Sequence, residues 1–488
     1  MSGVWGLRLP KPNTPCAGRA ALSWSSAKLE NVQTDPAPFA FADLFAGIGG
    51  FHAMLSHAGG RCVFVSEIDR QARATYLRNW VDPLPEKLRP VINEDITTAT
   101  PGEGDGPVAV PAHDVLAAGF PCQPFSKSGH QRGMDEARGT LFWNIARVLQ
   151  ERKPAVVMLE NVRNIAGPRH RHEWEVIIRT LREIGYRVSE TPTIFSPHFL
   201  HPDLGGTPQV RDRVFILGTL IGPERVRAEL AQGLAPMPVV PRGPVAEWIP
   251  SLWKTESILD EDPTIERLSE YQLSDTEIEW INTWDEFVKR FRASYNVRLP
   301  GFPLWLDDWR PIAELEARAD FLDLPEWKQQ LLRSNANFFE VHRPLIENWL
   351  KDFPQVLAFP ASRRKLEWQA QDLESLWDTV LQLRPSGIRA KAPTYLPALV
   401  AITQTSIFGP RKRRITPHEA ARLQGLPTNF TFGNQPDRAS YKQVGHGVSV
   451  GAAWYVFRNH VEQNAADLPD RLVNAVRSAA IKPPTAGA

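Results

Sequence analysis

The stretch FAFADLFAGIGG, which runs from Phe39 to Gly50, joins a short apolar segment to a glycine-rich turn. Its first half, FAFADLF, is apolar and bounded, which predicts a buried strand. The glycines permit a tight turn and a close approach of the backbone to a ligand, and the helix-forming residues FHAMLSHAG follow them. This order predicts a strand, a ligand-facing loop and a helix, although GxGG alone also fits a plain strand–helix turn.

The same alternation continues to about Gly222. Four further segments predict buried strands: CVFVSEID, AHDVLAAGFP, KPAVVMLENV and DRVFILGTL. The segments QARATYLRNW, TLFWNIARVLQE and EWEVIIRTLREIG predict helices that lie between them. Strands that alternate with helices predict an α/β fold, in which helices cover both faces of a parallel sheet.

After Gly222 the chain becomes rich first in proline and then in tryptophan. Ten of the sixteen tryptophans lie between Trp248 and Trp377, among segments that predict amphipathic helices. We expect these tryptophans to form a core rather than platforms for bases. The chain therefore divides into an irregular arm, a first part of the α/β domain, a largely helical insert, and a return to the α/β domain. These parts span residues 1–38, 39–220, 221–410 and 411–488.

The overall composition limits the class of protein. A chain of 488 residues predicts roughly two to four domains. The net charge of +1 gives no overall attraction for polyanions, so a nucleic-acid surface would need local clusters of Lys and Arg. Such clusters occur at Arg363–Lys365, at Arg384, Arg389 and Lys391, and at Arg411–Arg414. Each is either a solvated face or a surface that binds polyanions.

The three cysteines, Cys16, Cys62 and Cys122, are an odd number without CxxC spacing. A disulfide framework and a zinc knuckle are both disfavoured, and a reducing, cytoplasmic location without a metal site is expected. No apolar run approaches the ~20 residues needed to cross a bilayer. The first residues lack the basic start and apolar core of a secretory signal.

Two acidic residues follow predicted strands. Glu67 ends the strand after the glycine loop, where a nucleoside-binding sheet places a carboxylate for ribose hydroxyls. Asp95, in NEDIT, follows the next segment and is placed to meet an adenine. Each acid alone is more often a solvated surface carboxylate. The glycine loop and two acids in this order favour a nucleoside cofactor.

Cys122 lies in GFPCQPFSKSG, where two prolines hold the backbone in a non-helical loop. An isolated cysteine is by default a small buried hydrophobe, whereas a rigid loop can hold a thiol toward a ligand. Glu160, in LENV, ends another predicted strand and is placed to share a cleft with this cysteine. Arg211 and Arg213, in QVRDR, alternate along an extended segment. An arginine beside the acid and the thiol would hold the carboxylate and favour the thiolate.

Nine motifs together carry a resemblance to a known family. They are DLFAGIGG, SEID, NEDI, GFPCQPFS, RGTLFWNIARVL, ENV, QVRDR, RRITPHEAARLQGLP and YKQVGHGV. In this order the sequence resembles the DNA cytosine-5 methyltransferases of bacterial restriction–modification systems. The likeness covers Phe39 to about Gly222 and about Arg411 to about Arg458, and the Trp-rich insert occupies the place of the family's target-recognition domain.

The resemblance implies a Rossmann-like methyltransferase fold and a reaction at an extruded cytosine of duplex DNA. Cys122 matches the nucleophile that adds to C6, and Glu160 matches the carboxylate that contacts N3 and the exocyclic amine. Arg213, and secondarily Arg211, match the arginines that organise the pocket. C5 then accepts a methyl group from S-adenosylmethionine. The base that removes the C5 proton is not identified by the sequence.

The resemblance also implies contacts to the cofactor and to the DNA. The cofactor positions are Phe45, Gly47, Ile48 and Gly49 near the methionine part, Glu67 at the ribose, Ile68, Asp95 and Ile96 around the adenine, and Pro121, Leu141 and Val448 along the site. Gln123, Ser126 and Thr140 match positions near the flipped nucleotide or its phosphates, and the loop 127–139 is expected to close over DNA. In the insert, Arg389 would contact either a guanine edge or a phosphate.

One position departs from the family, because His446 stands where asparagine is usual. A histidine nitrogen can also donate to the methionine carboxylate, but with a longer reach. An active enzyme is still expected, because the nucleophile, the acid and the arginines are all present. The rivals are a tRNA cytosine-5 methyltransferase, a DNA-binding module with a relic site, and a Rossmann oxidoreductase. The expected partners are duplex DNA and, acting independently, a cognate restriction endonuclease. The protein is expected to be a monomer associated with the nucleoid.

Overall fold

The structure is a computed structural model that describes residues 37–102, 106–121, 140–245, 247–399 and 405–483. Cys122, Gln123 and Ser126 lie outside the described residues, as do the loop 127–139 and nearly all of the N-terminal arm. Among the helices that are described, none is both long and apolar enough to span a bilayer.

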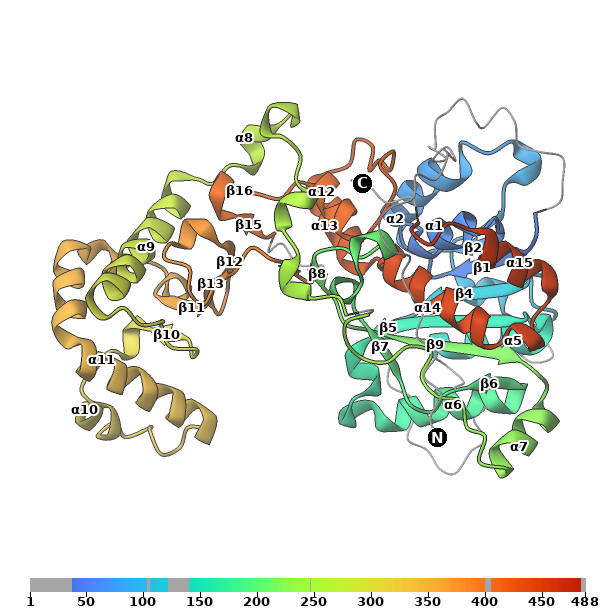
Figure 1. Cartoon of the computed structure of the whole chain (residues 1–488), viewed down its shortest axis with the longest axis horizontal. Coiled ribbons are helices and arrows are strands. Elements are labelled where there is room, and N and C mark those ends of the chain that lie inside the picture. Colours follow the sequence, from blue (N-terminus) through green and yellow to red (C-terminus); the bar gives the residue numbers. More distant parts are fainter. Residues whose placement is uncertain (1–36, 103–105, 122–139, 246, 400–404, 484–488) are drawn as a thin grey trace, which may run out of the picture. The chain divides into compact units, whose positions relative to one another are not determined.

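The first sheet has the strand order β3-β2-β1-β4-β5-β9-β6, and β7 also pairs with β9 (Figure 1). Its strands are β1 (Ala40–Leu44), β2 (Arg61–Ser66), β3 (Val91–Asn93), β4 (Val115–Gly119), β5 (Val156–Val162), β6 (Tyr186–Val188), β7 (Thr193–Phe195) and β9 (Arg213–Leu220). The first five strands in sequence run parallel, as predicted. The expectation of a wholly parallel sheet is wrong for the rest, because β9 runs antiparallel to β5, β6 and β7.

Helices cover both faces of this sheet. Successive strand residues point to opposite sides, so each strand contributes to two cores. On one face, Ala117 and Met158 lie in a core with α1 (Gly50–His57), α14 (Val450–Gln463) and α15 (Asp470–Ser478). On the other, Leu116 and Leu159 lie in a core with α5 (Leu141–Arg152) and α6 (Arg171–Ile184). The C-terminal helices α14 and α15 therefore cover one face of the sheet that the first half of the chain forms.

The remaining elements of this part of the chain are short. They are α2 (Arg70–Tyr76), which continues as a π-helical turn (Leu77–Val81), α3 (Ile96–Ala99), α7 (Pro223–Ala231), α12 (Pro417–Leu423), α13 (Asp437–His446), and the parallel pair β8 (Gln209–Val210) and β14 (Leu396–Pro397). β8 is part of the QVRDR segment, so its pairing with β14 holds that segment beside Leu396 and Pro397.

The insert contains helices, as predicted, and also five strands of a six-stranded sheet that the sequence did not reveal; the sixth strand, β16, belongs to the return segment. The helices are α8 (Leu268–Tyr271), α9 (Asp275–Tyr295), α10 (Ile312–Glu316) and α11 (Glu326–Asp352). The strand order is β10-β11-β13-β12-β15-β16. These strands are β10 (Leu304–Trp305), β11 (Lys365–Gln369), β12 (Val380–Arg384), β13 (Gly387–Lys391), β15 (Ile407–Phe408) and β16 (Arg413–Arg414).

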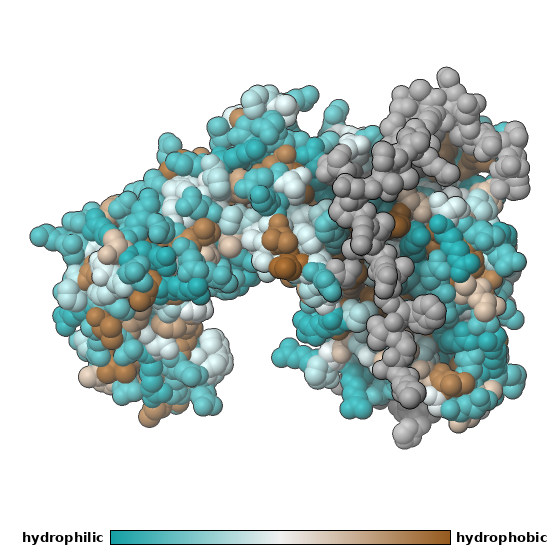
Figure 2. Space-filling view, viewed as in Figure 1, coloured by the Kyte–Doolittle hydropathy of each residue, from teal (hydrophilic) through white to brown (hydrophobic). Residues whose placement is uncertain are grey.

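The tryptophans of the insert form its core for the most part. Trp284 and Trp349 are fully buried, with ring centroids 5.5 Å apart, and Trp368 joins them from β11. Trp327 is the clear departure from the prediction, since it is 64% exposed. On the face drawn in Figure 2 the surface is mostly hydrophilic, and apolar residues form small separate patches.

Candidate active site

Most of the predicted site residues that the structure describes lie at one edge of the first sheet. The parallel strands β1 to β5 all end at this edge, and in such sheets ligands bind outside the carboxyl ends of the strands. The antiparallel strand β9 begins there, so that Arg213 lies opposite Val162 at the end of β5. Five strand ends and one strand start therefore bring together side chains that are far apart in the sequence.

The glycine loop after β1 is packed closely on one side and open on the other. Gly49 has φ 89°, and a Cβ added there would lie 2.1 Å from Nε1 of Trp80. The Trp80 indole donates a hydrogen bond of 2.8 Å to the carbonyl oxygen of Ile48. Gly47 also has positive φ, at 56°, but an added Cβ would meet no heavy atom within 4 Å. The turn needs both glycines for their backbone conformation, and only Gly47 faces open space.

Other predicted cofactor residues flank this loop in different ways. Phe45, with φ 55°, is half-buried at the start of the turn. Val448 is buried against Gly50, where its Cγ1 would lie 2.5 Å from an added Cβ. Leu141 is half-buried at the start of α5, and Pro121 is exposed at the end of the described segment after β4. The role of Trp80 was missed, since nothing in the sequence links it to the loop.

Glu67 connects the second strand end to the glycine loop. Its carboxylate accepts hydrogen bonds of 2.7 Å from the backbone N–H groups of Gly47 and Asp69. Burial raises the pKa of Glu67, and these two hydrogen bonds oppose that change. The adjacent Ile68 is 73% exposed, which leaves an apolar side chain on the surface beside the carboxylate.

At the third strand end, Asp95 caps a helix. Its Oδ1 accepts hydrogen bonds from the backbone and the hydroxyl of Thr97, at 3.0 and 2.8 Å. Ile96 is 3% exposed and lies in the core, so its side chain supports the edge from within. The structure thus brings Asp95 to the predicted edge, with its carboxylate already holding the first turn of α3.

Glu160 and Arg213 form a buried ion pair at the centre of the edge. Arg213 Nε lies 2.8 Å from Glu160 Oε1, and the Glu160 side chain is 9% exposed. Burial raises the pKa of Glu160, whereas the charges of Arg213 and Arg211 lower it. The predicted meeting of the acid with QVRDR is therefore present in the fold, and burial is the larger of the opposing effects on the carboxyl.

Arg211 is buried and binds backbone carbonyls rather than the acid. Its Nη2 donates hydrogen bonds to the carbonyl oxygens of Gly445, at 2.8 Å, and Gly447, at 2.6 Å. Its Nη1 donates to the carbonyl of Leu399 at 3.2 Å. Burial lowers the pKa of Arg211 to about 9, and the neighbouring charge of Arg213 acts in the same direction. Arg211 thereby ties the last motif of the chain to this edge of the first sheet.

His446 lies between those two glycines, as the last residue of α13, and its side chain is partly exposed. Partial burial of its ring lowers its pKa, and the charges of Lys442 and Arg211 act in the same direction, while Asp69 opposes them. Its place next to the glycine carbonyls that hold Arg211 puts it at the same edge as the glycine loop. Gly447 would carry a Cβ 4.0 Å from the side chain of Ile48.

The end of β4, which leads toward Cys122, is fixed to the end of β5. Gly119 pairs with Glu160, and a Cβ added to Gly119 would lie 3.6 Å from Glu160 Oε2. Asn161 donates a hydrogen bond of 2.9 Å from Nδ2 to the carbonyl oxygen of Phe120. Thr140, 8% exposed, caps α5 through a 3.3 Å hydrogen bond from the N–H of Trp143. Sequence reasoning missed Asn161, although it stands in the ENV motif.

Arg389 lies away from this edge, on β13 of the second sheet. It forms a two-point ion pair with Glu367 on β11, through Nε and Nη2 at 2.8 Å each. The carboxylate partner was not predicted, because the pairing depends on strand register. Among the described residues, no group of three or more His, Cys, Asp or Glu side chains is arranged to hold a metal ion.

Comparisons with known proteins agree on one family. The profile of the family described as C-5 cytosine-specific DNA methylase matches residues 39–462. Type II methyltransferase M.AluI of Cellulosimicrobium cellulans is 46% identical in an alignment of 508 positions that covers 90% of this chain and 96% of that protein. Type II methyltransferase M.BanI of Aneurinibacillus aneurinilyticus is 28% identical over 88% of this chain and 97% of its own length. Type II methyltransferase M.HhaI of Haemophilus parahaemolyticus is 38% identical over 36% of this chain and 48% of its own length.

Proposed function

The chain belongs to the C-5 cytosine-specific DNA methylase family and is a methyltransferase of that class, and on this premise we propose the reaction at its site. The protein transfers a methyl group from S-adenosylmethionine to C5 of a cytosine that is extruded from a specific duplex DNA sequence. The observation that carries this proposal is the buried Glu160–Arg213 pair, which lies at the same sheet edge as the glycine loop.

The residues at the edge are suited to activate a pyrimidine. C5 of cytosine becomes nucleophilic when a thiolate adds to C6, and Cys122 is the proposed thiolate. Glu160 holds N3 and the exocyclic amine, and Arg213 fixes the position of its carboxyl group. Because burial raises the pKa of Glu160, this carboxyl is suited to exchange a proton with N3 as charge develops on the ring. The thiol leaves after C5 loses its proton.

The same edge fits S-adenosylmethionine. Gly47 leaves the front of the loop open, the Glu67 carboxylate lies beside it to accept from ribose hydroxyls, and Ile68 offers an apolar surface to an adenine. When bound, the cofactor supplies the methyl group to C5. The other proposed contacts are Phe45, Ile48, Gly49, Asp95, Ile96, Pro121, Leu141 and Val448.

We assign sequence recognition to residues 221–410. To the whole protein we assign, in the cell, the protection of DNA from a restriction endonuclease that acts independently of it. The support is the similarity to a Type II methyltransferase over 90% of the chain, which reaches well beyond the catalytic motifs. Gln123, Ser126 and Thr140 are the proposed contacts near the flipped nucleotide. A single polypeptide supplies all of these groups, so a monomer is the proposed active form.

Bisulfite sequencing of DNA from a host that expresses the protein tests the proposal. The wild type should protect cytosines within one short duplex sequence, and Cys122→Ser should protect none. A purified sample should methylate duplex DNA but not tRNA, which separates the proposal from the tRNA methyltransferase alternative. Full protection by Cys122→Ser, or transfer to tRNA alone, would contradict it.

A further inference from the structure

The second sheet has one apolar face and one face that is polar mainly over β11 and β13. Leu366, Trp368, Ile388, Ala390 and Leu381 point into the core of the insert. The alternate residues point to the other face, where the strand register sets them in rows across β11, β13 and β12. The middle row is Glu367, Arg389 and Gln382, and the next row is Gln369, Lys391 and the buried apolar Val380. We call the five polar residues of these two rows the polar face.

The polar face is hollowed, and apolar residues complete the lining of the hollow. Arg389, Gln382, Lys391 and Gln369 line a hollow of about 180 Å³. The hollow also touches Val210, which directly precedes Arg211, and Pro397 of β14. Because β14 pairs with β8, the hollow adjoins the segment that holds the catalytic arginines.

One edge of the planar Arg389 guanidinium is paired with the Glu367 carboxylate. Its Nε donates to Glu367 Oε2 and its Nη2 to Glu367 Oε1, both at 2.8 Å. Within the described residues these are its hydrogen bonds, which leaves both N–H groups of Nη1 and the second N–H of Nη2. These remaining donors form the end of the guanidinium fork, and a two-point contact from such a fork to O6 and N7 is the commonest specific contact to guanine.

Glu367 argues against a phosphate as the partner of Arg389. A carboxylate 2.8 Å from the guanidinium offsets the charge of Arg389 and would repel a phosphate at the same place. The same carboxylate lies 4.0 Å from Nη1 of Arg384, so the cluster as a whole stays positive, and the distinction rests on the position of Glu367 directly beside Arg389. A neutral guanine edge meets no such repulsion. The side chains of Arg389 and Glu367 are 28% and 20% exposed, so the pair is accessible yet held in position by its surroundings.

Resting on the proposed function, we infer that Arg389 reads a guanine of the target sequence in the major groove and that Glu367 is the positioning residue that orients it. The closing experiment measures methylation of a duplex library randomised around the target cytosine. In the wild type the library should yield one motif that contains guanine. Arg389→Ala should relax the preference at one guanine position by roughly 5- to 150-fold, the change that corresponds to about 1–3 kcal/mol per base contact.

Further variants separate positioning from general damage. Arg389→Lys keeps the charge but not the fork and should relax the same position. Glu367→Ala should also relax that position alone, and Glu367→Gln, which keeps one acceptor oxygen, should do so less. Arg298→Ala is the matched control, because Arg298 makes an equivalent two-point pair with Asp372 at 2.6 Å and lies on an exposed part of the insert. Its motif should be that of the wild type.

Three outcomes would overturn the inference. A uniform loss of methylation in Arg389→Ala with an unchanged motif, together with a shallower salt dependence, would assign Arg389 to a phosphate. If Arg389→Ala does not fold, the other two variants decide the question. An unchanged wild-type motif in both Arg389→Lys and Glu367→Ala would then assign Arg389 to a phosphate rather than to a guanine. A wild-type protein that methylates no duplex would overturn the proposed function as well, whereas the first two results leave the proposed function intact.

Discussion

Asn161 donates a hydrogen bond of 2.9 Å to the carbonyl oxygen of Phe120, and its own Oδ1 accepts one of 2.8 Å from the N–H of Val162. One buried amide thus fixes the end of β5 to the segment that leads toward Cys122. The geometry of that segment decides how a thiol at position 122 would meet a base. Small misplacements of a reacting group cost large factors in rate.

Asn161→Ala should therefore lower kcat at least tenfold while the KM for the cofactor changes little. The Phe120 carbonyl loses its partner, at a cost of about 1–3 kcal/mol in the free energy of unfolding. Steady-state kinetics and denaturant unfolding measure the two effects. Asn459→Ala is the control, because Asn459 also donates to a carbonyl, at 2.8 Å, but within helix α14. Unchanged kcat in Asn161→Ala would contradict the prediction.

Glu160→Gln should abolish methyl transfer and should gain stability relative to the wild type as pH rises. Burial raises the pKa of Glu160, so the folded protein keeps this proton to higher pH than the unfolded chain does. The free energy of unfolding of the wild type therefore falls with rising pH between the two pKa values. Glutamine does not titrate, so the variant escapes this loss.

The difference between Glu160→Gln and wild type should be smallest near pH 4, close to the unfolded pKa of about 4.3, and grow by at most about 1.4 kcal/mol per pH unit. Denaturant unfolding from acid to neutral pH measures it. Glu316→Gln is the control, since Glu316 is 48% exposed and pairs with Arg333 at 2.8 Å. A difference that shrinks with rising pH would show that the ion pair with Arg213 outweighs burial.

Gly47→Ala and Gly49→Ala should separate cofactor binding from stability. An alanine at Gly49 would place its Cβ 2.1 Å from the Trp80 indole nitrogen, so this variant should lose stability. An alanine at Gly47 meets no heavy atom within 4 Å, so it should cost only the left-handed backbone penalty of about 1–2 kcal/mol. It should nevertheless weaken binding of S-adenosylmethionine at least tenfold, because it fills the front of the loop.

Thermal unfolding and calorimetric titration with S-adenosylmethionine measure the two effects. Retention of wild-type affinity in Gly47→Ala would show that the cofactor does not approach this side of the turn. The paired design matters because both glycines have positive φ, at 56° and 89°, so the backbone conformation alone cannot explain a difference between them.

Local signals predicted the first sheet well, because its strands are apolar runs that end in recognisable motifs. The antiparallel direction of β9 was not predictable, since DRVFILGTL reads equally well in either direction. The second sheet was missed for a different reason. β10, β15 and β16 have two residues each, too few to show a period of two, and β10 and β15 pair with β11 and β12 across long separations in the sequence.

The site shows the same division. Glu160 and Arg213 were placed together from motifs, and the fold brings them within 2.8 Å. Trp80 and Glu367 escaped notice because each acts through a partner that only the folded chain supplies. A tryptophan in a helix and a glutamate in a strand look like ordinary residues until the register of their neighbours is known.

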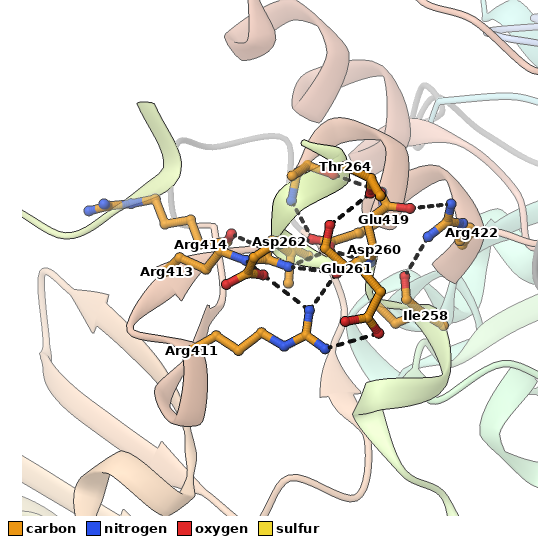
Figure 3. Close-up of polar contacts among 12 residues, drawn as sticks. Ile258, Asp260, Glu261, Asp262, Thr264, Arg411, Arg413, Arg414, Glu419 and Arg422 are labelled. Carbon is orange, nitrogen blue, oxygen red and sulfur yellow. Dashed lines mark hydrogen bonds and ion pairs between the residues drawn. The ribbon is translucent and has the colours of Figure 1, made fainter. Parts of the chain in front are cut away.

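The last prediction concerns the junction cluster, the charged residues that join the insert to the return segment: Asp260, Glu261, Asp262, Arg411, Arg413, Glu419 and Arg422 (Figure 3). Arg413 and Glu419 are 1% and 0% exposed and pair at 2.8 Å. Glu419 also accepts hydrogen bonds from the N–H groups of Asp260 and Thr416, at 2.8 and 2.7 Å. The Glu419 carboxylate thus contacts the segment that enters the insert, the segment that leaves it, and the first turn of α12.

Glu419→Ala should lower the free energy of unfolding by about 3–5 kcal/mol, because it leaves the charge of Arg413 buried without its main partner. Arg414→Ala is the control, since Arg414 pairs with Glu277 and its side chain is 29% exposed. That variant should lose about 1 kcal/mol or less. Replacing both members of the buried pair, Arg413→Met with Glu419→Leu, should recover much of the loss, since no buried charge is then left unpaired. A double variant less stable than Glu419→Ala would show that the hydrogen bonds to Asp260 and Thr416, rather than the paired charge, account for the stability of the junction cluster.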